Sequence, residues 1–204
     1  MDASFFDRHP AVRDGLQFVV FVVLVLIGTL FINTFVFRSF NVVGPSMEST
    51  MFTGDRLIVN RTAVTAAQIR GEPYLPQRGQ IIVFRNPQFV AGGRDEYIVK
   101  RVIGFAGERV VVRNGTVTVY NDDHPDGFNP DAADGLPGRP GPGSPTSGND
   151  DAVVPEGTLY VIGDHREGSH SCDSRGNCLG MIPLYDVIGP VSLRIWPVTK
   201  LSTY

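Results

Sequence analysis

Ser46 is the first residue in this sequence whose surroundings suggest chemistry. It lies in a stretch bent by Gly44 and Pro45, nine residues after the end of a long apolar run. A serine hydroxyl attacks a carbonyl carbon only when a neighbouring base takes its proton. Because Ser46 follows an apolar segment so closely, a substrate of this serine is expected to be held in a membrane.

Two kinds of residue could supply the base. The histidines are His9, His124, His165 and His170, and His165 or His170 could complete a histidine-based triad. The chain has only two lysines, Lys100 and Lys200, and Lys100 interrupts the apolar, strand-like segment 97–103. Both kinds of base remain open at this point.

Lys100 becomes a better base if its side chain points inward. Neighbouring residues of a strand face opposite sides, so one of Lys100 and Arg101 is expected to face inward and the other solvent. Burial disfavours the ammonium and lowers the pKa of a lysine from about 10.4; a drop of about three units gives a free amine at neutral pH. The structural alternative is a lysine at a sheet edge with its charge in water.

The apolar run from residue 15 to residue 37 holds no charged residue. As a helix these 23 residues reach about 34 Å, enough to cross a bilayer. The run has no polar face, exceeds the apolar core of a cleaved signal and ends in bulky residues, so it indicates a retained anchor. We therefore expect a tail at 1–14, a transmembrane helix at 15–37 and one folded domain at 38–204. The arginines on the two sides do not decide the orientation.

The expected domain is mainly β, an antiparallel sheet or barrel-like structure. Short segments rich in β-branched residues and bounded by turn residues lie at 55–60, 80–84, 97–103, 109–113, 116–120, 158–162 and 187–196. Asn114-Gly115 between two of them predicts a tight hairpin. A short helix is expected at 62–70. The net charge of -3 and the scattered arginines exclude a basic patch for nucleic acid.

Residues 121–152 interrupt the strand pattern. They include six Pro, six Gly and seven Asp, with Phe128 and Leu136 as the only large apolar side chains. This composition cannot build a core and predicts a flexible acidic insertion loop. Its aspartates lack the spacing of a calcium-binding loop, so no metal is expected there.

Several motifs occur in the same order as in a known family. They are Gly44-Pro45-Ser46-Met47, Gly54-Asp55-Arg56-Leu57-Ile58-Val59, the segments 78–84 and 97–104, Gly163-Asp164-His165-Arg166 and Asp173-Ser174-Arg175. This set, behind an anchor, resembles the bacterial type I signal peptidases, which are membrane-anchored serine–lysine proteases. The resemblance covers nearly the whole chain. It implies an endopeptidase that removes signal peptides from exported preproteins after small residues of the Ala-x-Ala type, without a cofactor.

The resemblance also implies a role for individual residues. Ser46 would be the nucleophile that forms an acyl-enzyme, Lys100 the general base, and the Ser46 N–H an oxyanion donor. Some members carry a hydroxyl two residues before the nucleophile, where this chain has Gly44. Met47 would help to shape the substrate cleft.

The last motif departs from the family pattern, because His165 replaces an asparagine and two extra residues separate its halves. The serine that orients the lysine is therefore Ser169, counted from Gly163, or Ser171, counted back from Asp173. Asp173 and Arg175 are expected to form an ion pair that stiffens this loop.

Cys172 and Cys178 lie in the same segment and could form a disulfide in an oxidising compartment. A zinc site completed by His165 or His170 is the alternative. The family topology implies a cytoplasmic amino-terminal tail and a catalytic domain outside the plasma membrane, with the lipid bilayer and signal peptides as partners. Two other functions remain open. One is a serine–lysine protease of the self-cleaving repressor kind, and the other is a non-catalytic, membrane-tethered domain that binds export partners.

Overall fold

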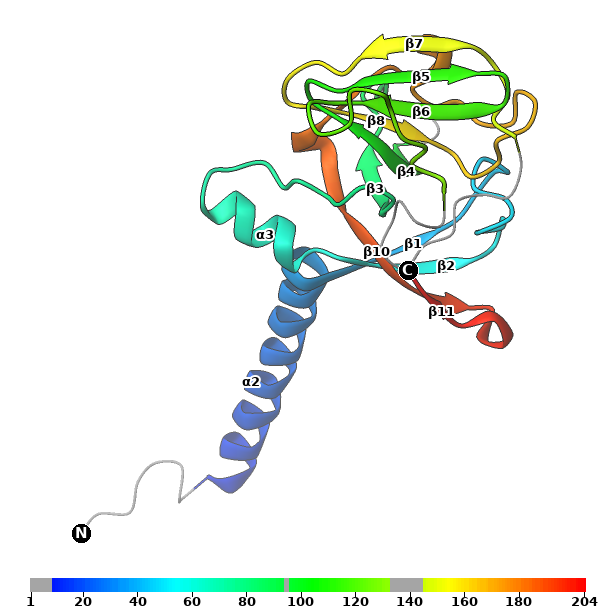
Figure 1. Cartoon of the computed structure of the whole chain (residues 1–204). Helices are drawn as coiled ribbons and strands as arrows, with labels where there is room; N and C mark the ends of the chain where they lie inside the picture. Colours follow the sequence, from blue (N-terminus) through cyan, green and yellow to red (C-terminus); the bar gives the residue numbers. More distant parts are fainter. Residues whose placement is uncertain (1–8, 94–95, 133–144) are drawn as a thin grey trace.

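A computed structural model describes residues 9–93, 96–132 and 145–204 (Figure 1). Its amino-terminal part is one long helix, α2 (Pro10–Phe31), which continues through a π-helical turn, Ile32–Val36. The rest of the described chain is mainly β, so the predicted fold class is confirmed. The helix projects from the β domain with its apolar side chains exposed.

The helical run passes directly into strand β1 (Phe37–Asn41). Three carbonyls at its end are bonded to the chain around the start of α3 (Thr62–Ile69). The Arg61 side chain donates to Thr34 O at 2.5 Å, the Thr65 hydroxyl to Phe35 O at 2.8 Å and the Arg61 N–H to Val36 O at 2.8 Å. The helix end is therefore attached to the domain at several points.

One antiparallel sheet of eight strands builds most of the domain, in the order β1-β2-β10-β3-β4-β8-β9, with β11 beside β10. Besides β1, its strands are β2 (Arg56–Asn60), β3 (Ile81–Arg85), β4 (Tyr97–Phe105), β8 (Thr158–Ile162), β9 (Ile182–Pro183), β10 (Val187–Trp196) and β11 (Ser202–Thr203). The long strand β10 pairs with β3 through its first half and with β2 through its second half, which curls the sheet. At the bend, a Cβ on Gly189 would lie 2.4 Å from Asn60 O, so only glycine fits.

A smaller sheet has the order β6-β5-β7. The hairpin between β5 (Arg109–Arg113) and β6 (Thr116–Tyr120) forms as predicted, and Asn114 and Gly115 have φ values of 53° and 81°. Strand β7 (Asp150–Val153) was not predicted, because it begins inside the Pro/Gly/Asp-rich segment. Buried side chains of β5 and β6 pack against Ile103 and Tyr160 of the larger sheet and join the two sheets.

The expectation of a loop throughout 121–152 is therefore wrong at its carboxyl end, where the chain pairs with β5. Phe128 also forms a bridge with Val119 of β6. Leu136 and Asp134 lie outside the described residues.

Candidate active site

The structure brings Ser46 and Lys100 into direct contact. Lys100 Nζ donates a hydrogen bond to Ser46 Oγ at 2.7 Å and another to Val99 O at 2.9 Å. Ser46 comes from the turn after β1, and Lys100 from the middle of β4. Only 2% of Lys100 is exposed, so the alternative of a lysine with its charge in water is wrong.

Two buried methionines anchor the turn that carries Ser46 to the hydrophobic core. Met47 and Met51 are fully buried in the core, and Met51 N–H donates to Met47 O at 2.8 Å. Gly44 allows the turn, because its φ of +94° lies in a region that side chains disfavour. The prediction for Met47 was that it shapes the cleft; the structure places it beneath the turn.

The prediction that Lys100 and Arg101 divide between an inward and a solvent-facing position is wrong, because both are buried. β4 lies between β3 and β8, and both of its faces are covered at this point. Arg101 is accommodated by Asp164, to which it donates from Nε at 2.7 Å and from Nη2 at 2.5 Å. Burial alone would lower the pKa of Arg101, but hydrogen bonds and charge from Asp164 raise it, so the guanidinium stays cationic.

Asp164 also reaches the turn of the serine. The Thr50 hydroxyl donates to Asp164 Oδ2 at 2.5 Å, while Arg101, the neighbour of Lys100, holds the same carboxylate. One buried carboxylate thus links the segment of Ser46 to the strand of Lys100. Sequence reasoning missed this role, although Asp164 stands in a motif that had been singled out.

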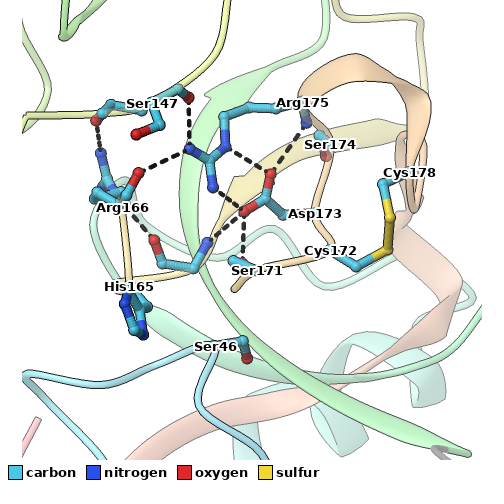
Figure 2. Close-up of polar contacts among 12 residues, drawn as sticks. Ser46, Ser147, His165, Arg166, Ser171, Cys172, Asp173, Ser174, Arg175 and Cys178 are labelled. Atoms are coloured by element: carbon cyan, nitrogen blue, oxygen red, sulfur yellow. Dashed lines mark hydrogen bonds and ion pairs between the residues drawn. A yellow bond between two sulfur atoms is a disulfide. The ribbon is translucent and has the colours of Figure 1, made fainter. Parts of the chain in front are cut away.

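The two serine candidates in the loop after β8 lie in different surroundings. Ser171 is half-buried, and its hydroxyl donates to Asp173 Oδ2 at 2.7 Å (Figure 2). A Cβ on Gly163 would lie 2.2 Å from Ser171 Oγ and 2.3 Å from Ser46 O, so both serines pack against this glycine. Ser169 is exposed. Ser171 is therefore the serine that lies at the site.

Asp173 and Arg175 form a buried, bidentate ion pair. Arg175 donates from Nε to Oδ1 at 2.9 Å and from Nη2 to Oδ2 at 2.8 Å. Burial alone would raise the pKa of Asp173. Hydrogen bonds and charge from Arg175, with smaller contributions from Ser171 and the Gly163 N–H, hold it below its ordinary value. The carboxylate is therefore ionised and available to accept the Ser171 hydrogen bond.

The Pro/Gly/Asp-rich segment takes part in holding this loop. The buried side chain of Arg166 donates to both carboxylate oxygens of Asp131, at 2.6 and 2.8 Å, and to Thr146 Oγ1 at 2.9 Å. Arg175 also donates to Ser147 O at 2.9 Å (Figure 2). Sequence composition suggested only a solvated loop here, and no signal in the sequence pointed to the pairing of Asp131 with Arg166.

Cys172 and Cys178 are joined in a disulfide, with an S–S distance of 2.07 Å. Neither sulfur is then a free thiolate for the zinc alternative. Among residues 9–93, 96–132 and 145–204, no cluster of three His, Cys, Asp or Glu side chains could hold a metal ion. The disulfide closes the chain around Asp173 and Arg175, so it belongs to the framework of the site.

Replacing both cysteines by serine is expected to lower the free energy of unfolding by about 2 kcal/mol, because a short disulfide loop restricts the unfolded chain. Urea unfolding of the protein in detergent micelles measures this change. Dithiothreitol should destabilise the wild-type protein by a similar amount and leave the double variant unchanged. Equal stability of the two oxidised proteins would show that the bridge contributes nothing.

Ser46 and Lys100 open into a cleft of about 340 Å³. Its lining residues are Phe40, Asn41, Val42, Val43, Gly44, Ser46, Leu57, Val83, Tyr97, Ile98, Val99, Lys100, His170 and Cys172. Residues 40–44 and 97–100 supply most of it. The rings of Phe40 and Tyr97 lie 5.2 Å apart, and the Arg38 guanidinium covers both. The cleft is mostly apolar, with its reactive groups contributed by Ser46 and Lys100.

An apolar helix, a mainly β domain and a serine in contact with a buried lysine are together typical of a membrane-bound peptidase. The family model described as signal peptidase, peptidase S26, matches residues 15–196, and the chain belongs to that family. It is accordingly a protease of the class that removes signal peptides.

Relatives named as signal peptidases match over almost the full length. Signal peptidase IB of Staphylococcus aureus (strain COL) is 27% identical over 93% of this chain and 94% of the relative. Signal peptidase I P of Bacillus subtilis subsp. natto is 26% identical over 96% and 97%, respectively. A crystal structure of a signal peptidase I from Enterococcus faecalis V583 is 25% identical, covers 58% of this chain and 97% of that chain, and has a TM-score of 0.41.

Proposed function

We propose that this protein is a membrane-anchored endopeptidase that cleaves signal peptides from exported preproteins, with Ser46 as nucleophile and Lys100 as general base. The observation that carries this proposal is the 2.7 Å contact between Lys100 Nζ and Ser46 Oγ in a cleft. This distance is within the reach required for proton transfer. Within the described part of the chain, neither candidate histidine makes a side-chain hydrogen bond to Ser46 Oγ: His165 contacts backbone carbonyls of the turn, and His170 lines the cleft with its ring stacked on His165.

The reaction proceeds in two stages. The neutral Lys100 amine accepts the Ser46 proton as Oγ attacks the scissile carbonyl, and the Ser46 N–H donates to the oxygen that gains the negative charge. The resulting ammonium protonates the departing amine as the peptide bond breaks, which leaves an acyl-enzyme on Ser46. Lys100 then takes a proton from a water molecule as the water oxygen adds to the acyl carbon. The bond between that carbon and Ser46 Oγ breaks, Oγ takes the proton back from Lys100, and the carboxylic acid product leaves.

Ser171 is the residue proposed to orient Lys100, since it packs with Ser46 against Gly163. Its own hydroxyl is held by Asp173, and Asp173 by Arg175. Side chains locked in this manner keep reacting groups in a narrow range of geometries, which is a large part of catalytic efficiency. Ser169 is too exposed to serve in this role.

The bilayer is proposed as the platform of the reaction. Residues 11–36 form a helix long and apolar enough to span a membrane, and none of that window is buried in the structure. The tail at 1–14 is proposed to lie in the cytoplasm and the domain at 38–204 outside the plasma membrane. The disulfide is compatible with this oxidising side. A precursor anchored in the same membrane meets the cleft at a raised effective concentration.

The substrate is proposed to bind as an extended segment between residues 40–44 and 97–100. Extended peptides commonly bind to strand edges, where backbone hydrogen bonds hold them and alternate side chains enter pockets. Val42, Leu57 and Val83 line the cleft with apolar side chains, and we propose that they form pockets for small side chains. This arrangement accounts for a preference for alanine at the first and third positions before the cut.

The selectivity of the cleft gives a direct test. In lipid vesicles, a precursor with alanine at both positions is expected to be cleaved with a kcat/KM about 100-fold higher than one with phenylalanine at the first position, because a bulky ring clashes with the walls. Quantification of the mature product measures the rates. Equal rates would contradict the proposed specificity, and binding of the precursor without any cleavage would indicate a non-catalytic tethered domain.

A further inference from the structure

His165 contacts the backbone carbonyl groups of two consecutive residues, Pro45 and Ser46. Its backbone N–H donates to Ser46 O at 3.1 Å, and its ring nitrogen Nδ1 lies 3.1 Å from Pro45 O. A carbonyl oxygen only accepts, so Nδ1 carries the proton and donates. Glu48 Oε2 lies 3.5 Å from the same nitrogen. One residue therefore holds two consecutive peptide groups.

The first of these peptide groups contains the proposed oxyanion donor. Pro45 C=O and Ser46 N–H belong to the same planar unit, in which the two groups point in opposite directions when the bond is trans. Fixing the direction of the Pro45 carbonyl therefore fixes the direction of the Ser46 N–H. A hydrogen bond to the carbonyl also polarises the amide and strengthens its N–H as a donor.

Orientation of this amide is especially important in this chain. Gly44 stands where some family members carry a second, hydroxyl donor. Its own N–H donates to Thr53 Oγ1 at 3.0 Å, and the Thr53 hydroxyl donates to Gly44 O at 3.3 Å. A Cβ at Gly44 would meet no atom within 4 Å, so packing at that point does not restrict the turn. Beyond Gly44, the Pro45 carbonyl accepts the turn hydrogen bond from the Glu48 N–H at 2.9 Å, and His165 Nδ1 adds a second, side-chain restraint on the same oxygen at 3.1 Å.

The His165 ring is itself held in place. It stacks on the His170 ring with centroids 4.5 Å apart, and Gly168 brings His170 into position through a turn at φ +59°. Figure 2 shows His165 directly beside the segment that leads to Ser46, on the opposite side of the loop from the disulfide. The ring is therefore placed to act on the backbone of the nucleophile rather than on its hydroxyl.

We propose that His165 is a positioning residue for the oxyanion donor: its Nδ1–H holds the Pro45–Ser46 peptide so that the Ser46 N–H points at the developing negative charge. The inference rests on the proposed function of Ser46. An asparagine, which the resembling family carries at this position, has a side-chain N–H that can reach the same carbonyl. His165→Asn is thus the conservative replacement, and His165→Ala removes the donor.

The experiment uses the full-length protein in detergent or vesicles and compares His165→Ala with His165→Asn. His165→Ala is expected to lower kcat about 10- to 100-fold with little change in KM, because a misdirected oxyanion donor loses part of its effect. His165→Asn is expected to retain most of the wild-type kcat. The matched control is His124→Ala, which removes an exposed histidine remote from the site and should leave both constants unchanged.

Inhibition by a substrate-like peptide aldehyde separates positioning from general damage. Addition of Ser46 Oγ to the aldehyde carbon creates an oxyanion, whereas the corresponding peptide alcohol cannot react. In His165→Ala the aldehyde should lose affinity by the same factor as kcat, while affinity for the alcohol stays constant. The ratio of aldehyde affinity to alcohol affinity depends only on the folded molecules, so partial unfolding does not alter it.

Two results would overturn the inference. One is an unchanged ratio of aldehyde to alcohol affinity in His165→Ala, and the other is a loss in His165→Asn as large as in His165→Ala. In both cases the wild-type protein would still cleave and Ser46 would still react. Absence of cleavage and of aldehyde binding in the wild-type protein would instead contradict the proposed function itself.

Discussion

Replacing Ser46 by alanine is expected to lower kcat for precursor cleavage by about 10⁶-fold, the size of loss that follows removal of a serine nucleophile. No other atom occupies the position of Oγ, which lies 2.7 Å from the amine that would accept its proton. Binding of the precursor should be retained, because the apolar walls of the cleft are unchanged. Single-turnover cleavage with excess enzyme in vesicles measures the residual rate.

The matched control for this variant is Ser49→Ala. Ser49 is an exposed serine in the same turn, and its replacement should leave the rate close to that of the wild-type protein. Cleavage by Ser46→Ala at a rate similar to that of Ser49→Ala would exclude Ser46 as the nucleophile. Trapping of an acyl-enzyme in the wild-type protein and its absence in Ser46→Ala would identify the attacked residue directly.

Replacing Lys100 by methionine is expected to lower kcat by about 10⁴-fold, the upper range for loss of a general base. Methionine is close to lysine in length and lacks a titratable group, so the buried position remains filled. Because serine and base act as one unit, the double variant Ser46→Ala/Lys100→Met should be no slower than Ser46→Ala alone. The same single-turnover assay detects this lack of additivity.

Lys200→Met provides the control, since Lys200 is the other lysine and is exposed near the carboxyl end of the chain. It should cleave at the wild-type rate. Substantial activity in Lys100→Met would point to a different base, and His165→Ala and His170→Ala made in that background would then decide between the remaining candidates.

Local features of the fold were predictable because they depend on residues close together in the sequence. The Asn114-Gly115 hairpin is an example, since both residues tolerate the positive φ that the turn requires. β1 was missed because Phe37 begins the strand while still belonging to an apolar run. Hydropathy alone cannot separate the end of a membrane helix from a strand that follows it directly.

The candidate site was predictable where single residues carry the chemistry and not where distant residues must pair. Ser46 could be singled out from its type and surroundings. Lys100 was named as the base only through the family resemblance, because the residues alone left the histidines open. The burial of Arg101 beside Lys100 depends on Asp164, which lies in the loop after β8. The Asp164 carboxylate pairs with the Arg101 guanidinium and balances its positive charge. Strand alternation describes one isolated strand, so it wrongly assigned one of the two residues to solvent.

The role of the Pro/Gly/Asp-rich segment was hidden for a similar reason. Composition indicated only a segment without a core of its own, but Asp131 needs only one partner, the buried Arg166, to become part of the framework. Such a pair has no periodicity, and it joins residues on different loops. Only the folded chain shows which aspartate of the segment is used.

The attachment of α2 to the domain has a consequence for the choice of cleavage site. α2, the π-helical turn and β1 follow one another without a linker, and Arg61 and Thr65 bind the last helical carbonyls. As a membrane anchor, this stiff connection would hold the cleft at a set height above the lipid. The enzyme would then cleave only those precursors whose scissile bond lies at the same height above the membrane, at a set distance from their own apolar segment.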